Sequence, residues 1–223
     1  MLPIGDDNPT RLTPVVNWSI IVGCVLVFLL QTSSGSRFFS YTLFTFGLVP
    51  DRVVSGDGFY TFVTNMFLHG GWSHLLGNML FLWIFGDNIE DCCGSLRYLM
   101  FYVACGVVAS AFWMLTAWGS PYPAVGASGA ISGVLGAYFV LYPSARIRTL
   151  VGFGYFWRVI RVRAYTMIGL WFAYQFILAA IPLNTGVAYW AHVGGFVAGI
   201  FLSKVIRPKL RRRVAYVDLE EFR

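Results

Sequence analysis

The chain has 223 residues, of which 57% are hydrophobic and only 12% are charged, and its mean hydropathy is +0.67. This composition excludes an ordinary soluble protein, in which about 25% of the residues are charged. A formal net charge of +6 would suggest nucleic acid as the partner of a soluble chain. Here the basic residues lie between and after apolar segments, so we expect the lipid bilayer as partner and no nucleic acid.

Apolar segments recur along the chain, and several approach the roughly 20 residues that a helix needs to cross a bilayer. Segments in lipid must be helices or a closed barrel, because an unpaired backbone group is very costly there. We see no period-2 alternation, which leaves helices. The sequence therefore predicts an all-α, polytopic membrane protein with six transmembrane helices, at approximately residues 15–30, 73–89, 96–118, 128–142, 164–181 and 187–206.

These helices divide the chain into three parts. Residues 1–14 are polar and contain three prolines, so we interpret them as a cytoplasmic N-terminal segment and not as a signal peptide. Residues 15–206 form the six-helix membrane domain, and residues 207–223 form a basic cytoplasmic tail. The long connection at 31–68 is rich in aromatic residues, which suit the membrane interface. We expect short helices there, lying partly in the bilayer surface.

The basic residues favour one orientation of the six helices. If the N-terminus is cytoplasmic, 14 of the 16 Lys and Arg residues lie on the inner side, and only Arg37 and Arg52 lie outside. Such a bias is typical of proteins with both termini inside. We therefore expect an integral, multi-pass protein of the cell (inner) membrane with cytoplasmic N- and C-termini. The helices that begin near Ser128 and His192 then both enter from the outer face.

The four cysteines lie within or beside apolar segments, and the adjacent pair Cys92-Cys93 lacks the spacing of metal ligands. Neither a disulfide framework nor a zinc site follows from such positions. We therefore expect no metal and no other cofactor.

A glycine-rich stretch at residues 126–133 contains the one plausible nucleophile, Ser128. A serine hydroxyl is a poor nucleophile until a base takes its proton, so it needs a partner from elsewhere in the fold. His192 is the best candidate among three histidines, because an ionisable residue within a membrane helix indicates function. A histidine that only hydrogen-bonds between helices is the structural alternative.

Small residues recur every four positions on the two helices that carry these candidates. They are Gly129 and Gly133 on the first helix, and Ala191, Gly195 and Gly199 on the second. Such spacing lets two helix backbones approach closely. Simple helix packing explains most motifs of this kind, but these two faces also carry a serine and a histidine. We expect the close approach to bring the imidazole to the hydroxyl.

His74 and Asn78 lie four positions apart, on one face of a predicted helix. Their imidazole and amide donors can stabilise the negative oxygen of a tetrahedral intermediate, together with the backbone N–H of Ser128. An interhelical hydrogen bond is the alternative role for Asn78. No carboxylate is a convincing third member, since we expect Glu90 to end its helix or to pair with Arg97. The sequence therefore predicts a Ser-His dyad.

These residues resemble the motifs of the rhomboid intramembrane serine proteases. The similar segments are Gly126-Ala127-Ser128-Gly129, His74 and Asn78 with His69 upstream, Ala191-His192 with Gly195 and Gly199, Phe46-Gly47-Leu48-Val49-Pro50, and Phe85-Gly86 with Glu90 and Gly94. Each motif alone is a weak signal, but their order across all six helices is highly specific. The resemblance implies that Ser128 opens a short central helix in a water-filled cavity, and that transmembrane substrates are cut near the outer membrane boundary.

The chain departs from the family pattern at two places. Ser132 stands four residues after Ser128, where the family often has an aromatic ring that packs on the histidine. Tyr60-Thr61 stands in the first loop where many members have Trp-Arg. The packing that orients His192 and the anchoring of the first loop therefore do not follow from the resemblance.

The sequence thus predicts an intramembrane serine endopeptidase that hydrolyses peptide bonds in or near transmembrane segments of membrane-protein substrates through Ser128 and His192. A catalytically inactive rhomboid-like protein that binds membrane clients is the alternative, although such proteins usually lack the serine or the histidine. A transporter or channel is disfavoured, because neither a pair of broken helices nor an acidic residue within the membrane indicates one.

Overall fold

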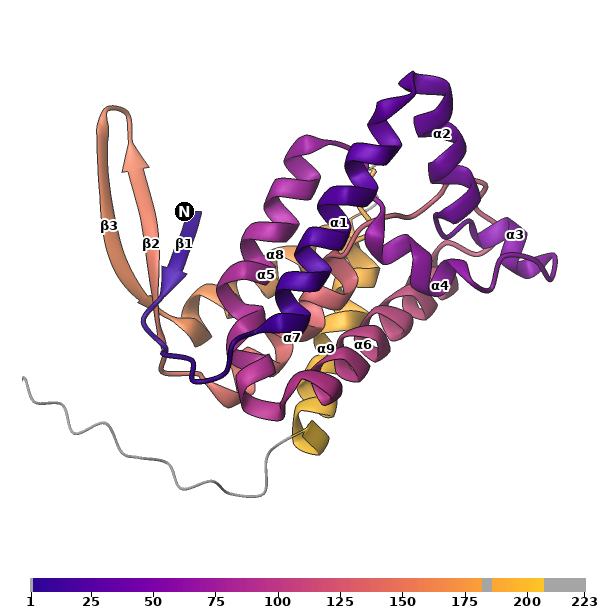
Figure 1. Cartoon of the computed structure of the whole chain (residues 1–223). Coiled ribbons are helices and arrows are strands. Elements are labelled where there is room, and N and C mark those ends of the chain that lie inside the picture. The colour runs from indigo at the N-terminus through magenta and orange to yellow at the C-terminus, as the bar shows by residue number, and fades with distance from the viewer. Residues whose placement is uncertain (1, 182–185, 207–223) are drawn as a thin grey trace, which may run out of the picture.

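The computed structural model describes residues 2–181 and 186–206, which form a bundle of helices with a small sheet beside it (Figure 1). The helices are α1 (Val15–Ser33), α2 (Gly35–Phe46), α3 (Pro50–Val54), α4 (Thr61–Thr64), the 3-10 turn η1 (Asn65–Phe67), α5 (Trp72–Cys93), α6 (Ser95–Thr116), α7 (Ser128–Leu141), α8 (Ala164–Ala180) and α9 (Tyr189–Ile206). The strands are β1 (Leu2–Asp6), β2 (Arg146–Phe153) and β3 (Phe156–Arg163). The predicted basic tail at 207–223 lies outside the described residues.

All six predicted membrane segments are helical, and their ends differ from the predicted ends by a few residues. They are α1, α5, α6, α7, α8 and α9. Within the described part of the chain, α1, α6 and α9 are long and apolar enough to cross a membrane, whereas α7 and α8 are shorter apolar helices. The helical structure of the six segments is therefore confirmed, whereas the number of membrane crossings stays a prediction.

The prediction of an all-α chain is wrong, because the connection between α7 and α8 is a β-hairpin. β2 and β3 pair antiparallel over their whole length, and β1 pairs antiparallel with the free edge of β2. The hairpin loop begins with Gly154 at φ +59°, and a positive φ at this position is what a type II′ turn requires. Ile147 and Thr149 are buried while Arg146 and Arg148 are exposed. The strands were not predicted, because the arginines of the exposed face resemble the charges of a cytoplasmic loop.

Two consecutive carboxylates, those of Asp6 and Asp7, bind the end of β1 to the rest of the molecule. The Tyr138 hydroxyl of α7 donates to Asp6 at 2.6 Å. Asp7 accepts from Arg161 at 2.8 Å and lies 3.6 Å from the Arg148 guanidinium. Burial raises the pKa of Asp6, and the Tyr138 hydrogen bond opposes this shift. The start of the predicted polar segment is therefore an ordered strand.

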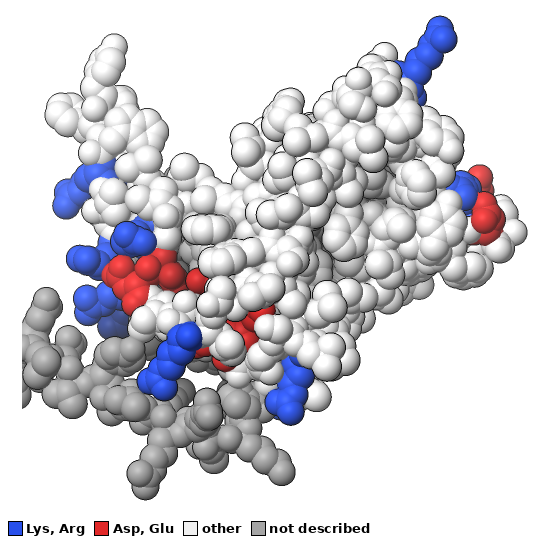
Figure 2. Space-filling view, in the orientation of Figure 1, with Lys and Arg blue, Asp and Glu red and all other residues white. Residues whose placement is uncertain are grey.

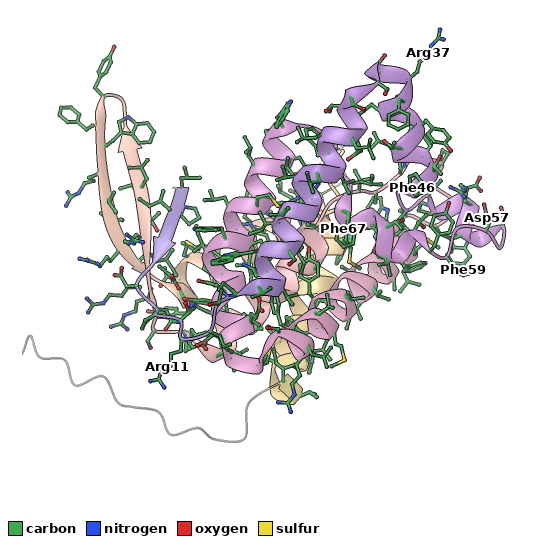
Figure 3. The ribbon with its side chains drawn as sticks, viewed as in Figure 1. Arg11, Arg37, Phe46, Asp57, Phe59 and Phe67 are labelled. Atoms are coloured by element: carbon green, nitrogen blue, oxygen red, sulfur yellow. The ribbon has the colours of Figure 1, made fainter. Side chains whose placement is uncertain are left out.

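Short helices fill the first connection, as predicted, and whether they lie in the bilayer surface stays a prediction. Phe46 and Phe67, labelled in Figure 3, line an apolar cavity of about 520 Å³ beside α1 and α2. Tyr60 and Thr61, the residues that depart from the family pattern, make anchoring contacts of their own. Tyr60 donates to the Thr45 carbonyl at 2.8 Å, and the Thr61 hydroxyl donates to a nearby backbone carbonyl at 2.5 Å.

Glu90 fastens the start of α1 to α5 and α6. Its buried carboxylate accepts hydrogen bonds from the Val16 amide at 3.1 Å, the Asn17 amide at 2.7 Å and the Ser95 hydroxyl at 2.6 Å. A carboxylate at the first amides of a helix is favoured by the helix dipole. Among the described residues no ion pair joins Glu90 to Arg97, so that predicted pairing is wrong. The structural role expected for Glu90 is nevertheless present.

Charge is distributed unevenly over the two ends of the molecule. Basic side chains gather over the sheet and the neighbouring end of the bundle, as Figure 2 shows. Figure 3 places Arg11 at this end and Arg37 at the opposite one. The cytoplasmic location of this end stays a prediction, which rests on the positive-inside bias.

The backbones of α7 and α9 lie in direct contact. A Cβ added to Gly195 or Gly199 of α9 would collide with the carbonyl oxygens of Gly129 and Gly133 on α7, and the Ala191 carbonyl lies 4.0 Å from a Cβ built on Gly129. The side chains of α6 occupy the space beside both α7 glycines. Nine of the 14 residues of α7 are buried, so this helix is the centre of the bundle.

Gly199→Ala is expected to destabilise the bundle by at least the roughly 1–3 kcal/mol that is typical of overpacking, because a backbone carbonyl cannot move aside as a side chain can. Gly23→Ala on α1 is the matched control, since its added Cβ would meet nothing within 4 Å. That substitution should leave the melting temperature unchanged or raise it slightly. Thermal unfolding of both variants in one detergent tests this prediction, and equal effects would contradict the close approach.

Candidate active site

Ser128 is the first residue of α7, and the loop before it is held by the first connection. Ala124 and Leu48 exchange two backbone hydrogen bonds at 2.9 Å, and the Gly126 amide donates to the Asn65 carbonyl at 2.9 Å. Gly126 has φ +127°, and a Cβ there would collide with an imidazole of α5. A residue without a Cβ accommodates both the positive φ and the nearby imidazole. This explains why position 126 is a glycine.

His192 lies in the first turn of α9, and its Nε2 atom is 2.8 Å from the Ser128 hydroxyl oxygen. The two residues are 64 positions apart in the sequence and meet because α7 and α9 pack so closely. With a lone pair on Nε2, the imidazole accepts the hydroxyl hydrogen, which is the arrangement that a general base needs. The structure therefore brings the two predicted catalytic residues together.

Gln175 of α8 contacts the other nitrogen of the same ring, with its Oε1 atom 2.8 Å from His192 Nδ1. Gln175 is buried, although only two other residues of α8, Ala164 and Ile168, are buried. It is absent from the predicted site, in which only carboxylates were candidates for a third member. The sequence feature that could have indicated Gln175 is that it is the single amide side chain within an uncharged, largely apolar helix.

Aromatic rings of α8 and α9 surround the His192 imidazole. The Trp171 centroid lies 6.2 Å from the imidazole centroid with the rings at 34°, and the Tyr189 centroid lies 6.3 Å away at 87°. Ser132 is fully buried, and its Cβ lies 3.3 Å from the position of a Cβ on Gly195. A larger side chain at position 132 would therefore press on α9. His192 is packed by Trp171 and Tyr189 instead of by an aromatic residue at that position.

His74 and Asn78 lie one turn apart on α5 and face the start of α7. His74 Nδ1 accepts a hydrogen bond from the Gly70 amide at 3.4 Å, so its Nε2 carries the hydrogen and can donate. Asn78 Nδ2 is buried and has no hydrogen-bond partner among the described residues. A Cβ built on Gly126 would lie 2.6 Å from His74 Nε2 and 3.6 Å from Asn78 Nδ2. Both donors therefore converge beside the residue two positions before Ser128.

The N-terminus of α7 adds backbone donors to the same place. The first hydrogen bond of the helix runs from the Ile131 amide to the Ala127 carbonyl at 2.9 Å. The amides of residues 128–130 consequently have no partner within the helix. Together with the positive end of the helix dipole, they favour a negative oxygen next to Ser128.

A cavity of about 560 Å³ joins these groups. Its lining includes Ser128, His192, His74, Asn78 and Gln175, and it reaches the loops that precede α5, α7 and α9. The 14 residues of α7 extend about 21 Å, less than the roughly 30 Å thickness of a hydrocarbon core. A helix of this length is too short to span a hydrocarbon core of that thickness. The cavity lies at the end of α7 where Ser128 begins the helix.

Comparison with known proteins identifies relatives of the chain. Residues 56–209 match the rhomboid domain. The chain is 31% identical over 193 residues to Rhomboid protease GluP of Bacillus subtilis, an alignment that covers 86% of the chain and 35% of GluP. YdcA of the same organism is 28% identical over 211 residues, which cover 91% of the chain and 94% of YdcA. Inactive rhomboid protein 1 of Danio rerio is 28% identical over 158 residues, 68% of the chain and 16% of that protein.

The rhomboid match covers more than half of the chain and includes α5, α6, α7, α8 and α9. The chain spans about a third of GluP, which has further sequence outside the alignment. The candidate membrane spans α1, α6 and α9 agree with the bundle that this domain implies. These observations show an integral, multi-pass membrane protein that belongs to the rhomboid family.

Proposed function

We propose that the chain is an intramembrane serine endopeptidase, which hydrolyses peptide bonds in or near the transmembrane segments of membrane-protein substrates. The observation that carries this proposal is the 2.8 Å contact between Ser128 Oγ and His192 Nε2 in a cavity that also contains His74 and Asn78. A nucleophile, a base and oxyanion donors within one cavity are the groups that acyl transfer needs. The similarity to a protein named Rhomboid protease GluP supports the same reaction.

In the proposed reaction Ser128 Oγ attacks the scissile carbonyl carbon while His192 Nε2 takes the hydroxyl proton. The carbonyl electron pair moves to the oxygen, and the donors of His74, Asn78 and the Ser128 amide hold this oxyanion. When the intermediate collapses, the C–N bond breaks and His192 gives its proton to the leaving amine. Water from the cavity then attacks the acyl carbon while His192 takes its proton. The ester C–O bond breaks, and His192 returns the proton to Ser128 Oγ, which restores the serine and releases the carboxylic acid.

The side of cleavage is part of the proposal. The loops beside the cavity precede α5, α7 and α9, and the basic residues gather at the sheet end. We therefore propose cytoplasmic N- and C-termini, a position in the cell (inner) membrane, and cleavage near the outer boundary of the bilayer.

An inactive rhomboid that binds membrane clients is the alternative, which the similarity to Inactive rhomboid protein 1 keeps open. Such a protein needs no proton acceptor at its serine. The hydrogen bond between Ser128 and His192 therefore favours the protease.

Cleavage of a transmembrane reporter in liposomes tests the proposed function. The chain is expected to cut a reporter helix that contains Gly or Pro, and to cut a poly-Leu helix at least about fivefold more slowly, because one glycine costs a helix roughly 1 kcal/mol. A stable helix hides its carbonyls in its own hydrogen bonds. Equal cleavage of both reporters would contradict the substrate preference. Cleavage by Ser128→Ala at the parent's rate would contradict the protease itself.

A further inference from the structure

We infer that Gln175 is a positioning residue, which holds the His192 imidazole in the tautomer whose Nε2 can accept the Ser128 proton. Its consequence for the reaction rests on the proposed function, whereas the contact itself is geometric. Gln175 Oε1 lies 2.8 Å from His192 Nδ1, and Nε2 of the same ring lies 2.8 Å from Ser128 Oγ. The three side chains form one hydrogen-bonded line from α8 through α9 to α7.

The position of the imidazole hydrogen decides which atoms donate and which accept in these two hydrogen bonds. A neutral imidazole carries one hydrogen, which resides on either of its two nitrogens. With the hydrogen on Nε2, no lone pair would face Ser128 and the ring could not take the hydroxyl proton. An amide oxygen only accepts, so its contact with Nδ1 is a hydrogen bond only when Nδ1 carries the hydrogen. Gln175 thus selects the reactive tautomer of His192, as a carboxylate does in serine-protease triads.

An amide suits this position better than a carboxylate. Gln175 has 7% of its surface exposed, and α8 contains no acidic or basic residue. A charged side chain within a membrane-spanning bundle is costly unless it is paired. The amide oxygen orients the ring without that cost, although it stabilises the imidazolium less than a carboxylate would.

Packing alone does not account for an amide at this place. Only three of the 17 residues of α8 are buried, and two of them, Ala164 and Ile168, are apolar. Ile168 and Gln175 are seven positions apart and therefore lie on the same helical face. A leucine would fill this apolar face and need no partner. The one polar side chain that α8 buries lies 2.8 Å from the histidine that is hydrogen-bonded to Ser128.

Nitrogen-15 NMR of histidine tests the inference without a substrate. The chain has three histidines, so selectively labelled protein in micelles gives three ring systems, and His192→Asn identifies the one that belongs to His192. We expect hydrogen on Nδ1 in the parent and a shift towards hydrogen on Nε2 in Gln175→Leu. Gln31→Leu removes another buried glutamine, which contacts Thr42 and the His69 amide, and should leave the His192 tautomer unchanged. An unchanged tautomer in Gln175→Leu would overturn the inference.

The rate at which a fluorophosphonate labels Ser128 gives a second readout. Gln175→Leu should lower this rate by about 10- to 100-fold, less than the loss of His192 itself, because the free ring still visits the reactive tautomer. Gln175→Glu keeps an acceptor oxygen at the same reach and should label faster than Gln175→Leu. Parent-like labelling of Gln175→Leu, or no recovery in Gln175→Glu, would count against the inference. A parent that is not labelled at all would contradict the proposed function, and the NMR result would still decide the tautomer.

Discussion

His192→Ala is expected to lower cleavage of the transmembrane reporter by about 10⁴- to 10⁶-fold, the range seen when the base of a serine hydrolase is removed. Among the described residues, the Ser128 hydroxyl has one hydrogen-bond partner, His192 Nε2 at 2.8 Å, so the His192→Ala site offers no side chain to accept the hydroxyl proton. The leaving amine also loses its proton donor. Initial rates in liposomes, with protein concentrations matched, measure the effect.

A double variant separates a working pair from two independent residues. Residues that act as one unit show non-additive losses, so Ser128→Ala with His192→Ala should be about as slow as either single variant. The thermal midpoint of each variant must stay near that of the parent, to exclude loss of the fold as the cause. Additive losses would mean that the two side chains do not act as a dyad.

Asn78→Ala is expected to lower kcat by about 10²- to 10³-fold with little change in KM, the loss typical of one oxyanion donor. Asn78 Nδ2 has no hydrogen-bond partner among the described residues, so the loss of this donor breaks no hydrogen bond of the free protein. We therefore expect the stability of this variant to be unchanged or slightly higher, since a buried donor without a partner is unfavourable.

Asn17→Ala is the matched control for this prediction. Asn17 is also a buried asparagine, but it donates to the Leu82 carbonyl at 3.0 Å and accepts from the Tyr98 hydroxyl at 2.8 Å. Its loss should lower the thermal midpoint and leave kcat of the folded fraction near that of the parent. A reversed pattern, with Asn78 needed for stability and Asn17 for kcat, would refute the oxyanion role.

The helices could be predicted from the sequence because each apolar segment must satisfy its own backbone in lipid, which is a local demand. The approach of α7 to α9 could be predicted for a similar reason, since small residues four apart mark one helical face. The β-hairpin at 146–163 could not be found in this way. Its open edge pairs with β1, and its buried residue Ile147 packs in the core of the bundle, which a scan for membrane helices does not consider.

The same contrast holds within the candidate site. Ser128, His192, His74 and Asn78 belong to short motifs whose spacing is visible in the sequence. Gln175 belongs to no such motif, because its partner is set by how α8 crosses α9. The rings that pack His192 also come from that crossing and from the first turn of α9, so the small residue at position 132 gave no hint of them.

Mass spectrometry of the chain after treatment with a fluorophosphonate in liposomes tests the central claim most directly. We predict one adduct on Ser128, absent from Ser128→Ala and formed at least about 10³-fold more slowly in His192→Ala, because the serine then lacks its base. No adduct in the parent, an adduct on another serine, or undiminished labelling of His192→Ala would contradict the proposed Ser128–His192 dyad.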